Sequence, residues 1–199
     1  MFNFLQPEHL ITAFGLFGIF CMIFLESGVF FGFFLPGDSL LFAGGIFASQ
    51  GYFNIGLLLA VVILAAILGD NFGYYFGRRV GVRFFKDDDS FFLSKNHLVR
   101  AEKFYKKYGP PTIILARFTP IVRTFTPIVA GAARMRYKTF VLYNIVGAIL
   151  WAFSVPLVGY FLHQKIPQVD ALIVPIVIVA MIASFVPVLW QLLKKYRIL

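Results

Sequence analysis

Residues 110–134 read PPTIILARFTPIVRTFTPIVAGAAR, and this stretch decides how the chain meets the membrane. It is largely apolar, but it contains Arg117, Arg123 and two prolines, Pro120 and Pro127, which interrupt helical hydrogen bonding. Basic residues mark the cytoplasmic ends of membrane segments. Because basic residues flank this stretch on both sides, we place both of its ends on the cytoplasmic side of the membrane. We therefore expect a re-entrant hairpin that bends at the prolines. The basic flanking residues are Lys106, Lys107, Arg134, Arg136 and Lys138.

The composition of the whole chain is that of an integral membrane protein. Of its 199 residues, 60% are hydrophobic and 14% are charged, and the mean hydropathy is +0.84. Soluble domains are about 45–50% apolar and about 25% charged, so soluble, disordered and collagen-like proteins are excluded. The single cysteine, Cys21, excludes an internal disulfide and cannot by itself form a zinc site.

The net charge of +9 reflects membrane topology and not a nucleic-acid partner. No Lys or Arg precedes Arg78, half of the 18 basic residues lie in 78–107, and three more lie in 194–197. Clusters of this kind mark cytoplasmic segments, so we place the loop 78–108 and the C-terminus in the cytoplasm. The N-terminus lacks a basic region before its apolar run, so we expect no cleaved signal peptide.

Several charge-free runs are long enough to cross a membrane. About 20 apolar residues span the hydrocarbon core as a helix, and the runs 39–69, 139–164 and 171–193 meet this length, while 9–25 is shorter. The stretch after Glu26 does not resemble a span, because FFGFFLPGD contains a Pro-Gly pair and ends in a carboxylate. We expect it to form a second hairpin, which enters from the outside and points at the first.

The expected fold is an all-α membrane protein with a single membrane domain. It has two inverted repeats, each a re-entrant helical hairpin plus a transmembrane helix, with an N-terminal helix and an additional C-terminal transmembrane helix. The expected segments are an N-terminal helix over 1–25, hairpins over 26–50 and 109–134, transmembrane helices over 53–77, 139–162 and 171–193, and a cytoplasmic basic loop over 78–108. This loop either contains an amphipathic helix on the inner membrane surface or is a solvated basic linker.

A short internal repeat supports this plan. Each copy has Ala-Gly, then Phe nine residues after the Gly, and later Gly-Tyr, although chance also produces matches this short. Inverted repeats of broken helices, with the site at their interface, recur in transporters. The first copy has Ala43, Gly44, Phe53, Gly73 and Tyr74, and the second has Ala130, Gly131, Phe140, Gly159 and Tyr160.

Five ionisable residues lie inside apolar sequence: Glu26, Asp38, Asp70, Arg117 and Arg123. A charge at the centre of a membrane helix costs about 2.5–3.5 kcal/mol. These residues must therefore pair with one another, take up protons or face water. The opposed hairpins would bring the acidic pair of the first toward the arginine pair of the second.

The two arginines are candidate phosphate ligands. The guanidinium groups of Arg117 and Arg123 stay charged when buried and match phosphate or carboxylate oxygens with two parallel hydrogen bonds. The alternative is that they only neutralise Glu26 and Asp38. Those carboxyls are candidate proton-coupling groups, since burial and a neighbouring guanidinium act on a carboxyl in opposite directions. Asp38 has the alternative of capping a helix.

The remaining candidates are secondary. Asp70 is expected to be structural and to pair with Arg78 or Arg79. The proline and glycine positions at the hairpin bends complete the set, and Trp151 is expected to pack or to face lipid. No catalytic or metal-ligand motif is present, so we expect no enzyme, cofactor or metal. The bend positions are Pro36, Gly37, Pro120 and Pro127, and the run of small residues that favours close helix packing is Gly69, Gly73, Gly77 and Gly81.

A set of motifs extends over nearly the whole chain: Glu26, FLPGDSLLFAGG at 34–45, GYYFGRRVG at 73–81, RFTPIVRTFTPIVAGAARM at 117–135, Asn144, Gly147 and Trp151. In these residues the chain resembles the DedA family, also called VTT-domain or SNARE-associated proteins. The resemblance implies bacterial inner-membrane proteins with two facing re-entrant hairpins, linked to undecaprenyl phosphate flipping and to the proton motive force, with eukaryotic relatives that scramble phospholipids. It assigns the essential acidic pair to Glu26 and Asp38 and the arginine pair to Arg117 and Arg123.

The expected function is that of a lipid-phosphate translocase in the bacterial inner membrane. Its partners would be a membrane lipid, either a polyprenyl phosphate or a phospholipid headgroup, and protons. No nucleic acid is expected, and a homo-oligomer is compatible with the sequence. The alternatives are a proton-coupled antiporter for small cations or drugs, a phospholipid scramblase, and a non-transporting membrane scaffold.

Overall fold

The computed structural model describes residues 7–28, 37–84 and 109–166, and every regular element within these ranges is a helix. This part of the chain is therefore all-α, as predicted, and no strand occurs in it. The helices are α1 (Pro7–Gly28), α2 (Gly37–Ser49), α3 (Ile55–Phe84), α5 (Thr112–Arg117), α6 (Pro120–Ala132) and α7 (Tyr137–Lys165).

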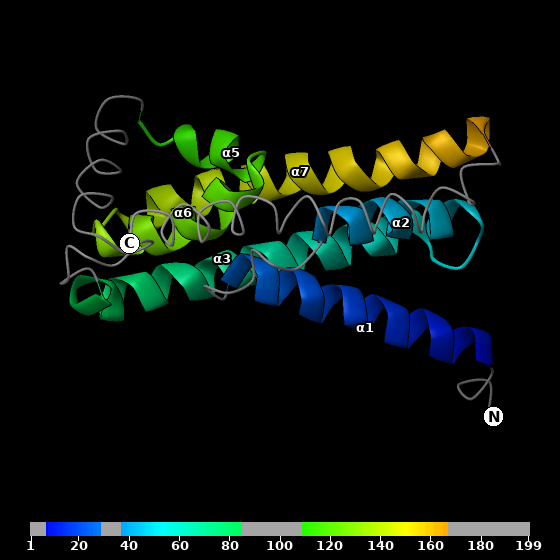
Figure 1. Ribbon diagram of the computed structural model, residues 1–199, viewed down its shortest axis with the longest axis horizontal. Helices are drawn as coiled ribbons and strands as arrows, with labels where there is room; N and C mark the ends of the chain where they lie inside the picture. Colours follow the sequence, from blue (N-terminus) through cyan, green and yellow to red (C-terminus); the bar gives the residue numbers. More distant parts are fainter. Residues whose placement is uncertain (1–6, 29–36, 85–108, 167–199) are drawn as a thin grey trace, which may run out of the picture.

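Two long apolar helices, α3 and α7, run along the longest axis of the molecule (Figure 1). They contain 30 and 29 residues, and at 1.5 Å per residue each is about 45 Å long. A hydrocarbon core is about 30 Å thick, so both can cross a membrane by length and composition. α3 continues to Phe84, so the first residues of the expected loop 78–108 are helical.

The outward faces of the long helices suit a lipid environment. Large apolar side chains lie exposed along both of them, where a soluble protein would place polar ones. They include Leu57, Leu64, Leu68 and Phe72 on α3, and Leu142, Leu150, Phe153, Val158 and Phe161 on α7.

The two short helices α2 and α6 lie in opposite halves of the molecule (Figure 1). α2 packs along α7, and α6 packs along α3. Asp38 in the first turn of α2 accepts a hydrogen bond from Arg123 in the first turn of α6. The N-termini of the two short helices therefore meet near the middle of the molecule.

The chain breaks between α5 and α6 at Phe118 and Thr119. Figure 1 shows α5 leading toward the middle of the molecule and α6 returning toward the same end. Pro120 is the first residue of α6. An N–H group at this position has no partner within the helix, so a proline there costs no helical hydrogen bond. Pro127, in contrast, lies inside α6, so it does not form the bend predicted for it. It lies next to Gly73 of α3 instead.

Glycines bring the backbones of α3 and α6 into direct contact. A Cβ atom at Gly77 would collide with the carbonyl oxygen of Ile128, and one at Gly131 would collide with the carbonyl oxygen of Tyr74. Close approach of this kind is how small residues stabilise helix pairs in membranes, where apolar burial gives little driving force. Gly77, one member of the run of small residues on α3, therefore serves helix packing.

The contact between α2 and α7 is built in the same way. A Cβ atom at Gly45 would collide with the carbonyl oxygen of Pro156, and one at Gly159 would collide with the carbonyl oxygen of Phe42. Thus α2 packs closely against α7, and α6 against α3, through one glycine from each helix of the pair.

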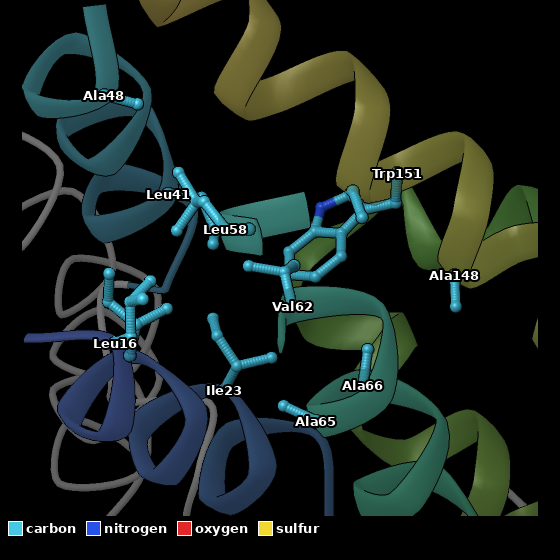
Figure 2. Close-up of a cluster of buried hydrophobic side chains, with 12 residues drawn as sticks. Leu16, Ile23, Leu41, Ala48, Leu58, Val62, Ala65, Ala66, Ala148 and Trp151 are labelled. Carbon is cyan, nitrogen blue, oxygen red and sulfur yellow. The ribbon is translucent and has the colours of Figure 1, made fainter. Parts of the chain in front are cut away.

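Buried apolar side chains from α1, α2, α3 and α7 fill one half of the molecule (Figure 2). A smaller cluster in the other half is centred on Tyr74, whose ring stacks on Phe140 at 4.6 Å and whose hydroxyl donates to the carbonyl oxygen of Met135 at 2.5 Å. The polar residues described below lie between the two clusters. The larger cluster includes Leu16, Ile23, Leu41, Leu58, Val62, Ala65, Ala66, Ala148 and Trp151.

Some expectations fall outside the described residues. These are the C-terminal span over 171–193, the amphipathic helix within 78–108, and Pro36 with the first part of the hairpin over 26–50. Residues 26–28, in contrast, belong to α1, which passes the boundary expected at residue 25.

We predict that Gly77→Ala destabilises the protein by about 1–3 kcal/mol, the usual cost of overpacking, because its Cβ would strike the backbone of α6. Thermal unfolding of the purified protein in detergent measures the effect. Gly18→Ala is the matched control, since a Cβ atom there meets nothing within 4 Å and alanine favours a helix over glycine. Equal melting temperatures for the two variants would contradict the role of the glycine contact.

Candidate functional site

Arg123 is held between two carboxylates where α1, α2 and α6 meet. Its Nη1 donates to Oδ1 of Asp38 at 2.6 Å, and its Nη2 donates to Oε1 of Glu26. The Glu26 side chain is only 4% exposed, whereas that of Asp38 is 41% exposed. Arg123 therefore joins a fully buried acid to one that is accessible from outside the protein.

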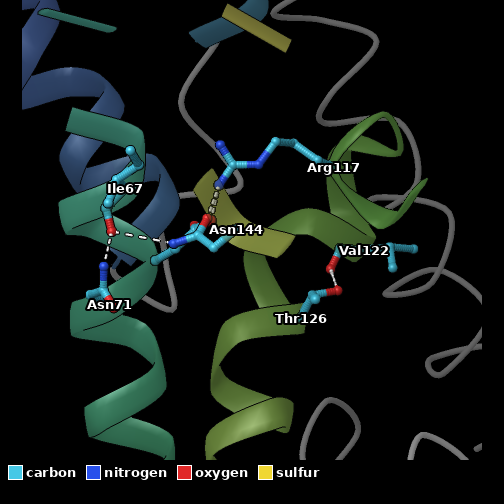
Figure 3. A network of polar contacts seen from close by, with 7 residues as sticks. Ile67, Asn71, Arg117, Val122, Thr126 and Asn144 are labelled. Atoms are coloured by element: carbon cyan, nitrogen blue, oxygen red, sulfur yellow. Dashed lines mark hydrogen bonds and ion pairs between the residues drawn. The ribbon is translucent and has the colours of Figure 1, made fainter. Parts of the chain in front are cut away.

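Arg117 forms a separate centre with α3 and α7. It lies in the last turn of α5, and its Nη2 donates both to Oδ2 of Asp70 and to Oδ1 of Asn144, the latter at 2.7 Å. Figure 3 shows Arg117 extended toward Asn144, whose amide nitrogen faces the carbonyl oxygen of Ile67. Arg117, Asp70 and Asn144 are all buried, so this pair is shielded from solvent.

Trp151 of α7 connects the two centres. Its indole Nε1 donates to Oδ1 of Asp38 at 3.0 Å. The guanidinium carbon of Arg123 lies 4.9 Å from the centre of the ring, and that of Arg117 lies 5.9 Å from it. Both distances are in the range of favourable cation–π contacts. Trp151 is therefore part of the site as well as of the apolar core.

The start of α2 is shaped around Glu26. A Cβ atom at Gly37 would collide with Oε2 of Glu26, so any larger residue there would force this carboxylate to move. Within the described part of the chain, Oε2 is buried and has no hydrogen-bond partner. A buried oxygen without a donor is costly, and protonation would lower the cost by reducing its charge.

A small cavity lies between the two arginines. Its volume is about 10 Å³, and it is lined by Ser27, Asp70, Arg117, Arg123 and Trp151. This is room for about one water molecule and is too small for a phosphate ester. In the conformation described here, the site is therefore closed around its own ion pairs.

The carboxylates of the site outnumber its guanidinium groups. Three acids face two arginines, which leaves one excess negative charge if all five are ionised. An uncompensated charge is expensive in a low-dielectric interior. The arrangement therefore favours uptake of one proton. Among the described residues, no group of three or more His, Cys, Asp or Glu side chains is suited to hold a metal ion.

The structure brings together the five ionisable residues that the sequence singles out, with one difference in their pairing. Asp70 pairs with Arg117, and not with Arg78 or Arg79 as expected. The guanidinium of Arg78 donates instead to the hydroxyl of Tyr74 on the preceding turn of the same helix. Asp70 therefore belongs to the candidate site, beyond the structural role predicted for it.

Two uncharged residues of the site are missed when its members are chosen by charge alone. Asn144 and Trp151 lie seven residues, or about two turns, apart on one face of α7. Gly147 between them faces the Arg117 side chain, because a Cβ atom there would lie 3.6 Å from its Nε. All three residues are among those that carry the family resemblance, although no role at the site was predicted for them.

We predict that Asp70 and Arg117 are energetically coupled. Asp70→Ala and Arg117→Met each leave a buried charge without its partner, which costs about 3–5 kcal/mol. The double variant removes both charges and should lose less stability than the two single losses together. A double-mutant cycle from thermal unfolding in detergent measures the coupling. The control cycle pairs Asp70→Ala with Arg78→Met, whose losses should add, and additive losses in the first cycle would contradict the pairing.

Comparison with known proteins identifies the relatives of this chain. Residues 35–161 match the VTT domain. An uncharacterised membrane protein of Mycobacterium tuberculosis is 40% identical over 201 residues, covering 97% of this chain and 88% of the relative. Protein DedA of Escherichia coli is 40% identical over 181 residues, covering 90% and 82%. Inner membrane protein YqjA of Escherichia coli is 29% identical over 189 residues, covering 90% and 85%.

No solved structure matches the chain. The VTT-domain match includes Asp38, Asp70, both arginines and Trp151, whereas Glu26 precedes it. The relative from Mycobacterium tuberculosis and YqjA are named as membrane proteins, which agrees with the apolar helices α3 and α7. The chain belongs to the DedA family of VTT-domain membrane proteins.

Proposed function

We propose that the protein is a lipid-phosphate translocase of the bacterial inner membrane, which moves undecaprenyl phosphate between the leaflets with proton coupling. The observation that carries this proposal is the pairing of Arg123 with Glu26 and Asp38 at the meeting point of two helix N-termini. A phosphate offers the guanidinium the same pattern of oxygens as these carboxylates. The site is thus already shaped for an anion.

Exchange between carboxylate and phosphate provides the coupling to protons. As long as Glu26 and Asp38 are ionised, they occupy the hydrogen-bond donors of Arg123. A proton on either acid weakens its hold on the guanidinium and makes room for a phosphate. The excess negative charge of the site favours this protonation. Proton binding and phosphate binding would therefore promote one another.

The closed cavity implies that transport needs a conformational change. A phosphate headgroup does not fit in about 10 Å³, so the ion pairs of Arg123 must open before it binds. The accessible carboxylate of Asp38 marks the side from which the headgroup would enter. The polyprenyl tail would remain in the lipid, against the exposed apolar faces of α3 and α7.

The proposal includes two inverted repeats with opposed re-entrant hairpins. It is supported by the crossed packing of α2 on α7 and of α6 on α3. Gly159 lies against Phe42 in one contact, and Gly73 lies close to Ile128 in the other. The proposed orientation puts 78–108 and the C-terminus in the cytoplasm of a multi-pass protein.

The proposed role is transport and not enzyme catalysis. The site would take a phosphate headgroup, with a phospholipid as the alternative to the polyprenyl lipid, together with protons. The role requires no metal, cofactor or nucleic acid, and it does not depend on whether the protein forms a homo-oligomer.

A proton-coupled antiporter for small cations or drugs is the second candidate, and one observation favours it. The acids of the site outnumber the arginines, so a cation could neutralise the excess charge in place of a proton. Proton flux that requires a soluble cation but no lipid phosphate, measured with a pH-sensitive dye in liposomes, would favour this function.

We predict that Arg123→Lys lowers translocation of a polyprenyl phosphate at least tenfold. Lysine keeps the charge but loses the fork that binds two oxygens at once, and a hydrogen bond to a charged group contributes about 1.5–3 kcal/mol. The measurement uses proteoliposomes with a fluorescent polyprenyl phosphate and a membrane-impermeant quencher. The matched control is Arg136→Lys, because Arg136 is exposed at the start of α7 and lies outside the site.

Other outcomes of the same assay distinguish the remaining functions. If the protein moved the uncharged polyprenol as fast as the polyprenyl phosphate, recognition of the phosphate would be contradicted. Fast movement of phospholipids in both directions without proton dependence would favour a scramblase. No lipid movement by the wild-type protein, together with full tolerance of substitutions at the charged site, would favour a membrane scaffold.

A further inference from the structure

The turn that ends α6 holds an arginine in an unfavourable backbone conformation. Arg134 has a φ of 53°, in the left-handed region that favours glycine. Its N–H donates to the carbonyl oxygen of Gly131 at 3.0 Å, and the N–H of Met135 donates to that of Ala130 at 3.0 Å. These two bonds define a Schellman motif, in which this position is usually glycine.

The end of α2 provides an internal comparison. There the N–H of Gly51 donates to the carbonyl oxygen of Ala48 at 3.1 Å, and that of Tyr52 donates to Phe47 at 3.0 Å. The motif is the same, and its left-handed position is Gly51, with a φ of 89°. The chain therefore uses the favoured residue at the end of one short helix and an arginine at the end of the other.

Arg134 lies in a cluster of exposed basic and aromatic residues, which we call the basic patch. The end of α3 and the turn between α6 and α7 are in contact, since Gly131 packs against the backbone of Arg78 and the hydroxyl of Tyr74 bonds to Met135. The basic patch consists of Arg78, Arg79, Arg134, Arg136 and Lys138, with Tyr75 and Tyr137.

Among the described residues around the basic patch, every charged side chain is basic. No Asp or Glu occurs in residues 71–84 or 109–166. The segment 85–108, which connects these ranges, has six basic and four acidic residues and is also net positive. Five exposed cations on one surface repel one another, so the patch favours a ligand that carries negative charge.

The tyrosines place the basic patch at the level of lipid headgroups. The rings of Tyr75 and Tyr137 lie 5.4 Å apart, and these residues are 48% and 36% exposed. Exposed tyrosines at the end of an apolar helix are typical of the interface between membrane and water. An anion that meets the patch at this depth is the phosphate of a lipid.

We propose that the basic patch is a surface binding site for the phosphate headgroups of anionic phospholipids, and that Arg134 is kept in its strained conformation for this contact. The proposed site is separate from the buried pairs of Arg117 and Arg123 and does not depend on transport. The backbone conformation of Arg134 thus lowers the stability of the protein, while its side chain contributes to lipid binding.

Arg134→Gly tests both parts of the proposal. In nanodiscs of phosphatidylcholine alone, the variant should melt about 2–4 °C above wild type, because glycine relieves the backbone strain. When phosphatidylglycerol replaces part of the lipid, wild type should gain stability from headgroup binding. The apparent affinity for phosphatidylglycerol, from the dependence of melting temperature on its fraction, should fall about fivefold in the variant.

Two further variants control for charge and position. Arg134→Lys keeps both the charge and the strain, so it should show the wild-type response to phosphatidylglycerol and no gain in phosphatidylcholine. Lys165→Gln removes one charge at the last residue of α7, away from the basic patch, and should respond as wild type does. An unchanged response of Arg134→Gly, or stabilisation of wild type by soluble glycerol phosphate as strong as that by the lipid, would overturn the lipid site.

If Arg134→Gly melts no higher than wild type in phosphatidylcholine, the proposal that the Arg134 conformation lowers the stability of the protein would be overturned. These readouts involve no lipid translocation. The proposed transport and the proposed surface site can therefore fail independently of one another.

Discussion

The neutralisation of buried charge is the constraint on which the rest of this structure depends. A charged side chain in a low-dielectric interior is tolerated only when it is paired and hydrogen-bonded. Glu26, Asp38, Asp70, Arg117 and Arg123 come from five different helices, and each finds its partner on another helix. The ion pairs therefore tie α1, α2 and α6 together on one side and α3 and α5 on the other. A shift of any one of these helices would leave a charge without its partner.

Much of the site was predictable because charge is so rare in this sequence. An ionised group within an apolar run has few reasons to be there, so the acids and the two arginines could be named without a structure. The glycines of α3 were predictable for a similar reason, since regular spacing of small residues favours close helix contact. The helical class and the long apolar helices followed from composition and length.

The partners within the site could not be predicted, because pairing depends on how the helices are packed. Asp70 lies two turns from Arg78 on its own helix, which made a local pair reasonable, yet packing brings Arg117 within reach of it. The position of the chain break was also ambiguous, since Pro120 and Pro127 are equally able to interrupt a helix. The fold uses the first as a helix start and accommodates the second beside Gly73. Trp151 was predicted only to pack or to face lipid, because the hydrogen bond from its indole N–H to Asp38 depends on how α2 packs against α7.

The position of Trp151 has an optical consequence. The chain has two tryptophans, and the indole of this one contacts both guanidinium groups and donates to a carboxylate. Indole emission responds to nearby charge and to solvent, so any event that separates the arginines from the acids alters the electric field at this chromophore. With the other tryptophan replaced by phenylalanine, the protein would carry an intrinsic spectroscopic reporter at the centre of its charged site.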